Sequence, residues 1–317
     1  MTTMTQQMKS LFLIGAMVGL LMAPAMAAKK HGEGGGNQAA ALEHAKKAVD
    51  ALEAKQFDVA YTEFTAAIQA DPKDARMYAN RAVALRALNR FPEALADCSK
   101  AIELDPKSYF GYMERSQTEI SQFQYDAALE DANKVVELKP DESAGYKFRG
   151  FAYIGLNQWD KAIADFTTAI EKKPDDLQNY DKRAQCYRSL KQYDPAIADY
   201  TAILSKDPNN NDALIKRGYT YASKEDYEKA IADYEAALKI KPDDYETVQR
   251  LQYARGMLAS KNAPPPSATP SPTPESGGLF TPLNIGIALA VILIVAVVVK
   301  LVTRGKDEAS TTSMRIR

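Results

Sequence analysis

Side chains that commonly perform catalysis or bind metals are scarce in this chain. Its 317 residues include two histidines, His31 and His44, and two cysteines, Cys98 and Cys186. Neither histidine lies next to a serine or cysteine nucleophile, and no histidine–cysteine cluster has the spacing of a zinc site. We therefore expect no catalytic residue, no metal site and no cofactor, and the protein is not predicted to be an enzyme.

The charged residues that recur regularly are arginine and aspartate. An arginine returns every 34 residues and an aspartate follows each one 16 residues later: Arg81 and Asp97, Arg115 and Asp131, Arg149 and Asp165, Arg183 and Asp199, Arg217 and Asp233. Lys47 and Glu63 hold the same two places nearer the N-terminus. In two antiparallel helices joined by a turn midway between these places, the opposite charges lie at one height. This predicts a ladder of structural ion pairs. The alternative, a basic groove for acidic ligands, is disfavoured because each arginine has its own carboxylate.

A proline that recurs with the same period indicates the helices that must position these charges. It recurs at Pro72, Pro106, Pro140, Pro174, Pro208 and Pro242. Twelve residues before each proline stands an alanine, and fifteen residues before it an aromatic residue; the alanines are Ala60, Ala94, Ala128, Ala162, Ala196 and Ala230. Small residues let two helices approach closely, while proline ends a helix. The pattern predicts stacked helix-turn-helix units.

This pattern resembles the tetratricopeptide repeat family over about two thirds of the chain. The resemblance implies an all-α, right-handed solenoid over residues 41–260, with its repeats at 41–74, 75–108, 109–142, 143–176, 177–210 and 211–244 and a capping helix at 245–260. Cys98 and Cys186 fall in different repeats, too far apart for a disulfide.

The two ends of the chain have the composition of targeting and membrane segments. Residues 1–28 are typical of a secretory signal peptide, although an uncleaved membrane anchor is an alternative. A Gly-rich spacer is expected at 29–40, a Pro/Ser/Thr-rich linker at 261–282, a transmembrane helix at 283–303 and a basic cytoplasmic tail at 304–317. We therefore expect a single-pass protein of the plasma (inner) membrane, with its repeats on the periplasmic side and the lipid bilayer as a partner through the C-terminal helix.

The surface expected to bind a partner is the concave face, which the first helix of each unit lines in the family. The resemblance places an apolar floor there between two polar margins. The floor is formed by Phe110, Met113, Phe148, Phe151 and Ile154; one margin by Arg76, Asn80 and Arg86, and the other by Asp181, Lys182, Gln185 and Arg188. Such a surface suits a protein or peptide partner. The alternative is that the aromatic residues only pack between neighbouring helices.

The overall charge argues against another class of partner. The formal net charge is −1 at pH 7, and the repeats carry no dense basic stripe, so nucleic acid is not an expected partner.

The leading functional hypothesis is a protein-interaction scaffold of the cell envelope. One alternative is a cytosolic, tail-anchored co-chaperone. Related co-chaperones grip a terminal carboxylate with five polar side chains, but the matching places here hold Ala45, Val49, Asn80, Phe110 and Glu114, and only Asn80 fits. Another alternative is a structural envelope component that associates with copies of itself.

Overall fold

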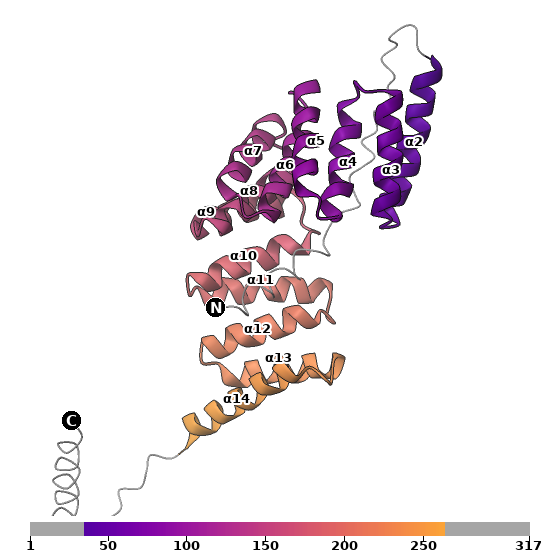
Figure 1. The fold of residues 1–317 in the computed structure, drawn as a ribbon. Helices are drawn as coiled ribbons and strands as arrows, with labels where there is room; N and C mark the ends of the chain where they lie inside the picture. The colour runs from indigo at the N-terminus through magenta and orange to yellow at the C-terminus, as the bar shows by residue number, and fades with distance from the viewer. Residues whose placement is uncertain (1–34, 264–317) are drawn as a thin grey trace, which may run out of the picture. The chain divides into compact units, whose positions relative to one another are not determined.

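The computed structural model describes residues 35–263, which form thirteen α-helices and contain no β-strand (Figure 1). Twelve of the helices form six hairpins with a period of 34 residues: α2 (Gly35–Glu53) with α3 (Phe57–Ala70), α4 (Ala75–Ala87) with α5 (Phe91–Leu104), α6 (Tyr109–Ser121) with α7 (Tyr125–Leu138), α8 (Ser143–Gly155) with α9 (Trp159–Lys172), α10 (Leu177–Ser189) with α11 (Tyr193–Lys206), and α12 (Asn211–Ser223) with α13 (Tyr227–Ile240). The last helix is α14 (Tyr245–Asn262). The predicted all-helical solenoid is confirmed.

The described part of the chain differs from the predicted boundaries at both ends. Helix α2 begins at Gly35, inside the predicted spacer, because the alanines that follow the glycines favour helix strongly enough to extend it backwards. Helix α14 continues to Asn262, past the predicted end of the cap. No helix in residues 35–263 is both long and apolar enough to cross a bilayer. The predicted signal peptide, transmembrane helix and basic tail lie outside the described residues.

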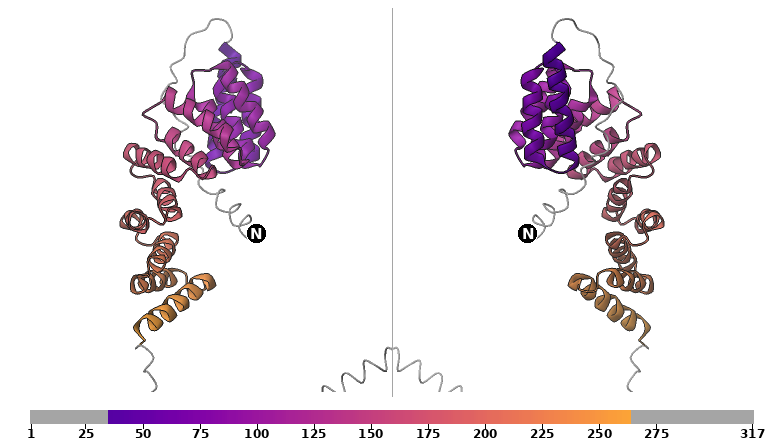
Figure 2. Two further views of the ribbon diagram at one scale, coloured as in Figure 1. Left: turned by 90° about the vertical axis from the view of Figure 1, so that its left-hand side faces the viewer. Right: turned by 90° about the vertical axis from the view of Figure 1, so that its right-hand side faces the viewer.

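Each hairpin packs on the next, as the two side views of Figure 2 show. The second helix of a hairpin contacts its own first helix and the first helix of the following hairpin, for example α5 with α4 and with α6. Neighbouring first helices also contact each other, α4 with α6 and α6 with α8. The first helices therefore share one surface of the solenoid, which we call the inner face.

Proline and a left-handed residue set the ends of the helices. Each second helix ends two residues before its proline, and the residue between them is extended, as at Asp71 with φ −136° and ψ 89°. Each hairpin turn contains one residue with positive φ, at Lys55, Asn89, Phe123, Asn157, Lys191 and Glu225. The turn geometry thus repeats although the residue type does not.

Small residues allow the two helices of each hairpin to meet. The six alanines that precede the prolines are completely buried. The Ser116 hydroxyl donates a hydrogen bond of 2.9 Å to the carbonyl oxygen of Ala128. This bond directly joins the first and second helices of the third repeat where they meet. At Gly150 an added Cβ atom would lie 2.9 Å from the Phe166 ring, so this crossing leaves no room for a side chain.

The predicted arginine–aspartate pairs are present in all five repeats, from Arg81 with Asp97 to Arg217 with Asp233. Each arginine donates two hydrogen bonds to its aspartate, from Nε and Nη2, at 2.6–2.9 Å. The aspartates are buried, with 4–7% of their surface exposed. The paired carboxylate raises the pKa of Arg149, so this rung stays charged.

Each of these arginines also reaches the preceding repeat. Its Nη1 donates to a side-chain oxygen on the second helix of that repeat, as from Arg183 to Thr167 Oγ1 at 2.9 Å and from Arg149 to Asn133 Oδ1 at 3.1 Å. The other acceptors are Thr65, Ser99 and Thr201. The ladder therefore joins neighbouring hairpins as well as the two helices of one hairpin.

The expected first rung, Lys47 with Glu63, does not form. Glu63 instead lies 2.7 Å from Nδ1 of His44, and Lys47 pairs with Glu43 one turn earlier in the same helix. Lysine lacks the planar fork with which arginine holds both oxygens of a carboxylate. The first repeat is therefore joined by a different contact.

Glu119 is a buried carboxylate beside the Arg115–Asp131 pair of the ladder. It is 8% exposed, and its Oε2 has no hydrogen-bond partner within residues 35–263. Burial and the Asp131 and Glu130 carboxylates raise its pKa, Arg115 lowers it, and together they bring the pKa to about 7. The pKa in the folded state therefore lies above its ordinary value of 4.5.

Removing one carboxylate of the ladder should destabilise the solenoid. Asp165→Ala leaves Arg149 half-buried without its partner, so we expect the free energy of unfolding to fall by about 3 kcal/mol. Asp175→Ala removes an exposed pair with Lys206 and should leave the free energy of unfolding nearly unchanged. Urea denaturation followed by circular dichroism measures both. Equal midpoints for the two variants would contradict a structural role for the ladder.

The stability contribution of Glu119 should depend on pH in a defined direction. A raised carboxyl pKa favours folding only while the group is protonated, so the wild type loses stability as pH rises from about 4.5 to about 7. Glu119→Gln keeps the shape without the charge. We expect the variant to melt at a higher temperature than the wild type at pH 8, and this advantage to disappear near pH 4.5.

The exposed neighbour Glu130 supplies the control for this titration. Glu130→Gln removes only the smallest contribution to the Glu119 pKa, so its difference from the wild type should change much less with pH than that of Glu119→Gln. A Glu119→Gln difference that stays constant between pH 4.5 and pH 8 would show that the carboxyl titrates normally.

Candidate functional site

The predicted partner-binding residues all lie on first helices, in α4, α6, α8 and α10. Contacts between neighbouring first helices bring several of them together. The Arg86 guanidinium in α4 donates to Gln117 Oε1 at 2.9 Å and to Glu114 Oε2 at 3.4 Å, both in α6. The inner face is therefore one connected surface in this part of the solenoid.

The apolar floor is only partly available to a partner. Met113 and Phe151 are 6% and 7% exposed, and the Phe151 ring packs edge-on against Phe166 at a centroid distance of 5.5 Å. For these two residues the structure agrees with the alternative, packing between helices, and corrects their assignment to the binding surface. Phe110, Phe148 and Ile154 are half-buried and keep part of their surface on the inner face.

The polar margins differ in how much surface they expose. Arg76 is exposed and held by Asp74, with Nη2 to Oδ2 at 2.6 Å, and Gln185 is exposed. Asn80, Arg86 and Arg188 are half-buried. Asn80 Oδ1 and Arg86 Nε are buried atoms with no hydrogen-bond partner among the described residues.

Glu114 is the most enclosed acidic group on this part of the inner face. It is 6% exposed. Burial raises its pKa, and the neighbouring Arg86 works against that effect. Its carboxylate pairs with Arg86 rather than facing solvent. The co-chaperone grip needs a side chain here that binds a terminal carboxylate, but this chain has an acidic group that is already paired.

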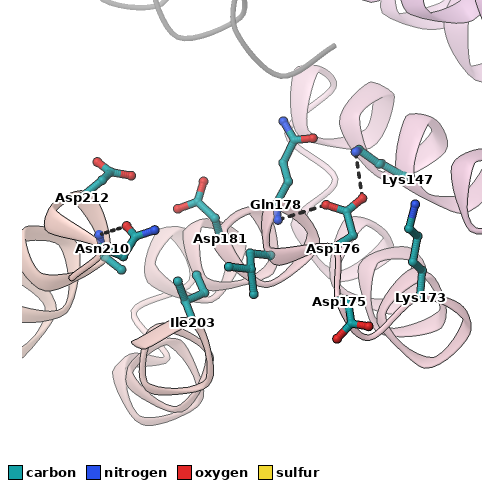
Figure 3. Close-up of a pocket in the computed structure, with 11 residues that line it drawn as sticks. Lys147, Lys173, Asp175, Asp176, Gln178, Asp181, Ile203, Asn210 and Asp212 are labelled. Carbon is teal, nitrogen blue, oxygen red and sulfur yellow. Dashed lines mark hydrogen bonds and ion pairs between the residues drawn. The ribbon is translucent and has the colours of Figure 1, made fainter. Parts of the chain in front are cut away.

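A hollow of about 710 Å³ is lined by residues from the N-terminal parts of α8, α10 and α12 and from the loop between α9 and α10 (Figure 3). Lys147 Nζ and the Asp176 carboxylate face each other across 3.0 Å, and both side chains are almost fully buried. Burial lowers the pKa of Lys147 and the Asp176 charge counteracts this. Asp181 is held by Lys216 at 2.7 Å. We call this the central hollow; its charges largely neutralise one another.

A second hollow of about 530 Å³, the C-terminal hollow, lies between α12, α13 and α14. Its lining includes the exposed Tyr219 and Tyr253 together with Arg250. The guanidinium carbons of Arg188 and Arg250 stand 4.5 Å and 5.2 Å from the centre of the Tyr219 ring. Arginine over an aromatic ring is a favourable cation–π arrangement.

Neither hollow was found from the sequence, although a signal for both was present. Lys147 and Asp181 are the fifth residues of the fourth and fifth repeats. Tyr219 and Tyr253 are the ninth residues of the sixth repeat and of the cap. These are places of the first helix that the family directs to the inner face. The prediction stopped at the fifth repeat.

The cysteines and the acidic residues form no reactive cluster in the described part of the chain. Cys98 and Cys186 are buried and free. Burial raises the pKa of the Cys186 thiol to about 12 and that of Cys98 as well, so both stay protonated near neutral pH. No group of three metal-ligating side chains comes together within residues 35–263.

Comparison with solved structures gives the same architecture. The crystal structure of YrrB, described as a TPR protein with an unusual peptide-binding site, is 27% identical, with a TM-score of 0.50 over 61% of this chain and 97% of that one. PilF from Pseudomonas aeruginosa is 16% identical, with a TM-score of 0.59 over 70% of this chain and 99% of that one. The Cut9–Hcn1 complex of the APC/C matches at 17% identity and 0.59, over 68% of this chain and 42% of that one. The last two show the fold alone.

Comparison with family models identifies the repeat unit. A model described as tetratricopeptide repeat matches residues 75–108 and 212–244, and a second with the same description matches residues 149–211. No curated protein sequence matches the chain. The first matched segment covers the hairpin of α4 and α5, and residues 212–244 cover that of α12 and α13. The second model begins within α8 and reaches the start of α12. These segments of the chain are therefore similar to tetratricopeptide repeats, and the remaining hairpins share their fold and period.

Proposed function

We propose that this protein is an interaction scaffold that binds a peptide, or an extended segment of a partner protein, along its inner face. The observation that carries the proposal is the contrast between two surfaces. The arginine ladder satisfies its hydrogen bonds within the solenoid, whereas Asn80 Oδ1 and Arg86 Nε on the inner face have no hydrogen-bond partner in the described part of the chain. Buried polar atoms are rarely left unpaired, so these two are suited to bind a ligand backbone or side chain.

The apolar part of the same surface supports this proposal. Phe148 and Ile154 are half-buried on α8, and α8 contacts α6, the helix that carries Gln117 and Glu114 of the Arg86–Gln117–Glu114 cluster. Partly exposed apolar groups beside unpaired polar atoms are typical of surfaces that bind extended peptides. The similarity to YrrB, whose description includes a peptide-binding site, agrees with this assignment.

We further propose that the scaffold belongs to the cell envelope and has no catalytic role. The support is the sequence of the two ends: the signal-like residues 1–28, the apolar stretch 283–303 and the basic residues 304–317. In this arrangement the repeats are periplasmic and the C-terminus is cytoplasmic. N-terminal sequencing of the membrane-extracted protein tests it, with a mature start at Ala28 or Lys29 as the expected result.

The two alternative functions differ in what favours them. The co-chaperone function has little support, because Glu114 is enclosed and paired at a place that must receive a carboxylate. Self-association is favoured by the strongly exposed Tyr245 on α14, which is 74% exposed. Light scattering of the full-length protein in detergent distinguishes a single copy from an assembly.

Removing the accessible apolar side chains should weaken peptide binding without unfolding the repeats. We expect the double variant Phe148→Ala with Ile154→Ala to bind peptides selected on the wild type at least about tenfold more weakly, because it loses the partly exposed apolar contact area. Fluorescence anisotropy with peptides from a displayed random library measures the change.

Two further variants separate binding from folding. Lys134→Ala changes an exposed residue of the second helix α7 and should leave the affinity unchanged. Phe151→Ala opens a cavity in the core and should lower the melting temperature instead. Unchanged affinity in a folded double variant would rule out this part of the inner face.

A further inference from the structure

Arg188 lies beside the C-terminal hollow, against the Tyr219 ring that lines it, and one feature distinguishes it from the other arginines. Among the arginines of residues 35–263, Arg188 alone has no carboxylate within 4.0 Å, whereas each of the others has one. Arg188 is half-buried, so this charge is partly removed from water without an acidic partner. Such a charge is costly to enclose unless a ligand completes the pair.

The groups around Arg188 hold its guanidinium in place but do not neutralise it. It stands over the Tyr219 ring at 4.5 Å. The nearest acidic groups on α10 and α12 are already engaged, since Lys216 binds both Asp181 at 2.7 Å and Asp212 at 2.6 Å. Glu246, the acidic residue of the hollow, is bound by Arg250. Counting Arg188, Arg250 and Glu246, the site carries one uncompensated positive charge.

A buried tyrosine hydroxyl lies beside Arg188. Tyr200 is fully buried, and its hydroxyl is adjacent to the Arg188 guanidinium. Burial raises the pKa of Tyr200, and the adjacent Arg188 partly offsets the increase. Phenylalanine holds the same place in the first and fourth repeats, as Phe64 and Phe166, so packing alone does not require the hydroxyl.

The walls of the hollow suit an apolar group next to an anion. Tyr219 and Tyr253 are 42% and 62% exposed. Arg250 lies 5.2 Å from the Tyr219 ring, so both guanidinium groups share one aromatic platform. A ligand that carries a negative charge next to an aromatic or aliphatic side chain matches both parts of this surface.

We propose that the C-terminal hollow binds an acidic side chain of the partner peptide, with the carboxylate on Arg188 and a neighbouring apolar side chain against Tyr219 and Tyr253. This inference rests on the proposed function, because it names the chemistry of a peptide bound on the inner face. The hollow sets specificity for acidic residues, while the surface around Phe148 contributes sequence-tolerant contact.

The test uses the full-length protein in detergent and a labelled peptide with blocked ends that has glutamates on both sides of a tryptophan. Its twin has glutamines instead. Fluorescence anisotropy should show the wild type binding the glutamate peptide about tenfold more tightly than the twin, with a preference that falls as salt is raised. Arg188→Gln should bind both peptides equally. Arg188→Lys should keep part of the preference, because it retains the charge without the planar contact.

Arg255→Gln is the matched control, since Arg255 lies on α14 but pairs with Glu235 outside the hollow. It should keep the full preference. Tyr219→Leu, which removes the platform but not the charge, gives a second variant in case Arg188→Gln fails to fold by circular dichroism; it should reduce the preference severalfold.

Other outcomes separate the failure of this inference from failure of the proposed function. Equal binding of both peptides by the wild type, no binding of either, or a preference that Arg188→Gln keeps would each overturn the acidic specificity. The proposed function would survive if library peptides still bound through Phe148 and Ile154. A phosphoserine version that bound tightly, while the glutamate peptide bound no better than its twin, would assign the hollow to phosphate and overturn the carboxylate.

Discussion

The solenoid depends on one arginine in each of the last five repeats, which joins three helices at once. A hairpin of 34 residues cannot bury both of its faces alone, so each repeat needs its neighbour. The arginine lies on a first helix, holds the buried aspartate of its own second helix through two hydrogen bonds, and donates a third to the second helix of the preceding repeat. Five such contacts in register fix the spacing of successive hairpins.

Because the ladder and the alanine contacts determine the stacking, the inner face is free to vary. The fifth place of the first helix is Ala79 in the second repeat, Lys147 in the fourth and Asp181 in the fifth, while the seventh place stays arginine in all three. Conserved geometry with changing side chains gives a series of local environments along one surface. The Arg86 cluster, the central hollow and the C-terminal hollow are three of these.

The features of the fold that could be predicted are those whose contacts recur with the 34-residue period of the sequence. The hairpins, the helix ends at proline and the arginine–aspartate pairs each repeat, so the pattern of one chain was sufficient. The burial of Met113 and Phe151 did not follow, because it depends on how closely neighbouring first helices approach. The Lys147–Asp176 pair joins α8 to the N-cap of α10, 29 residues further along the chain, and has no periodic signal. At the first repeat, His44 rather than Lys47 binds Glu63, which the pattern alone had assigned to the ladder.

The position of the C-terminal hollow also has a thermodynamic consequence. In a linear array the terminal elements contact a neighbour on one side only and open more easily than the middle. Helix α14 buries Leu251 and Ala254 against α13, but it has no second helix within the described residues, and Tyr245 and Tyr253 remain exposed.

A ligand held by Arg188 on α10, Tyr219 on α12 and Tyr253 on α14 would hold these three helices together directly. Without the ligand they are connected through the helices that lie between them in the stack. Binding free energy would then appear as added stability of this end, since a ligand that binds only the folded state shifts the local equilibrium toward it. The same surface that selects the partner would thereby order the end of the solenoid nearest the C-terminal segment of the chain.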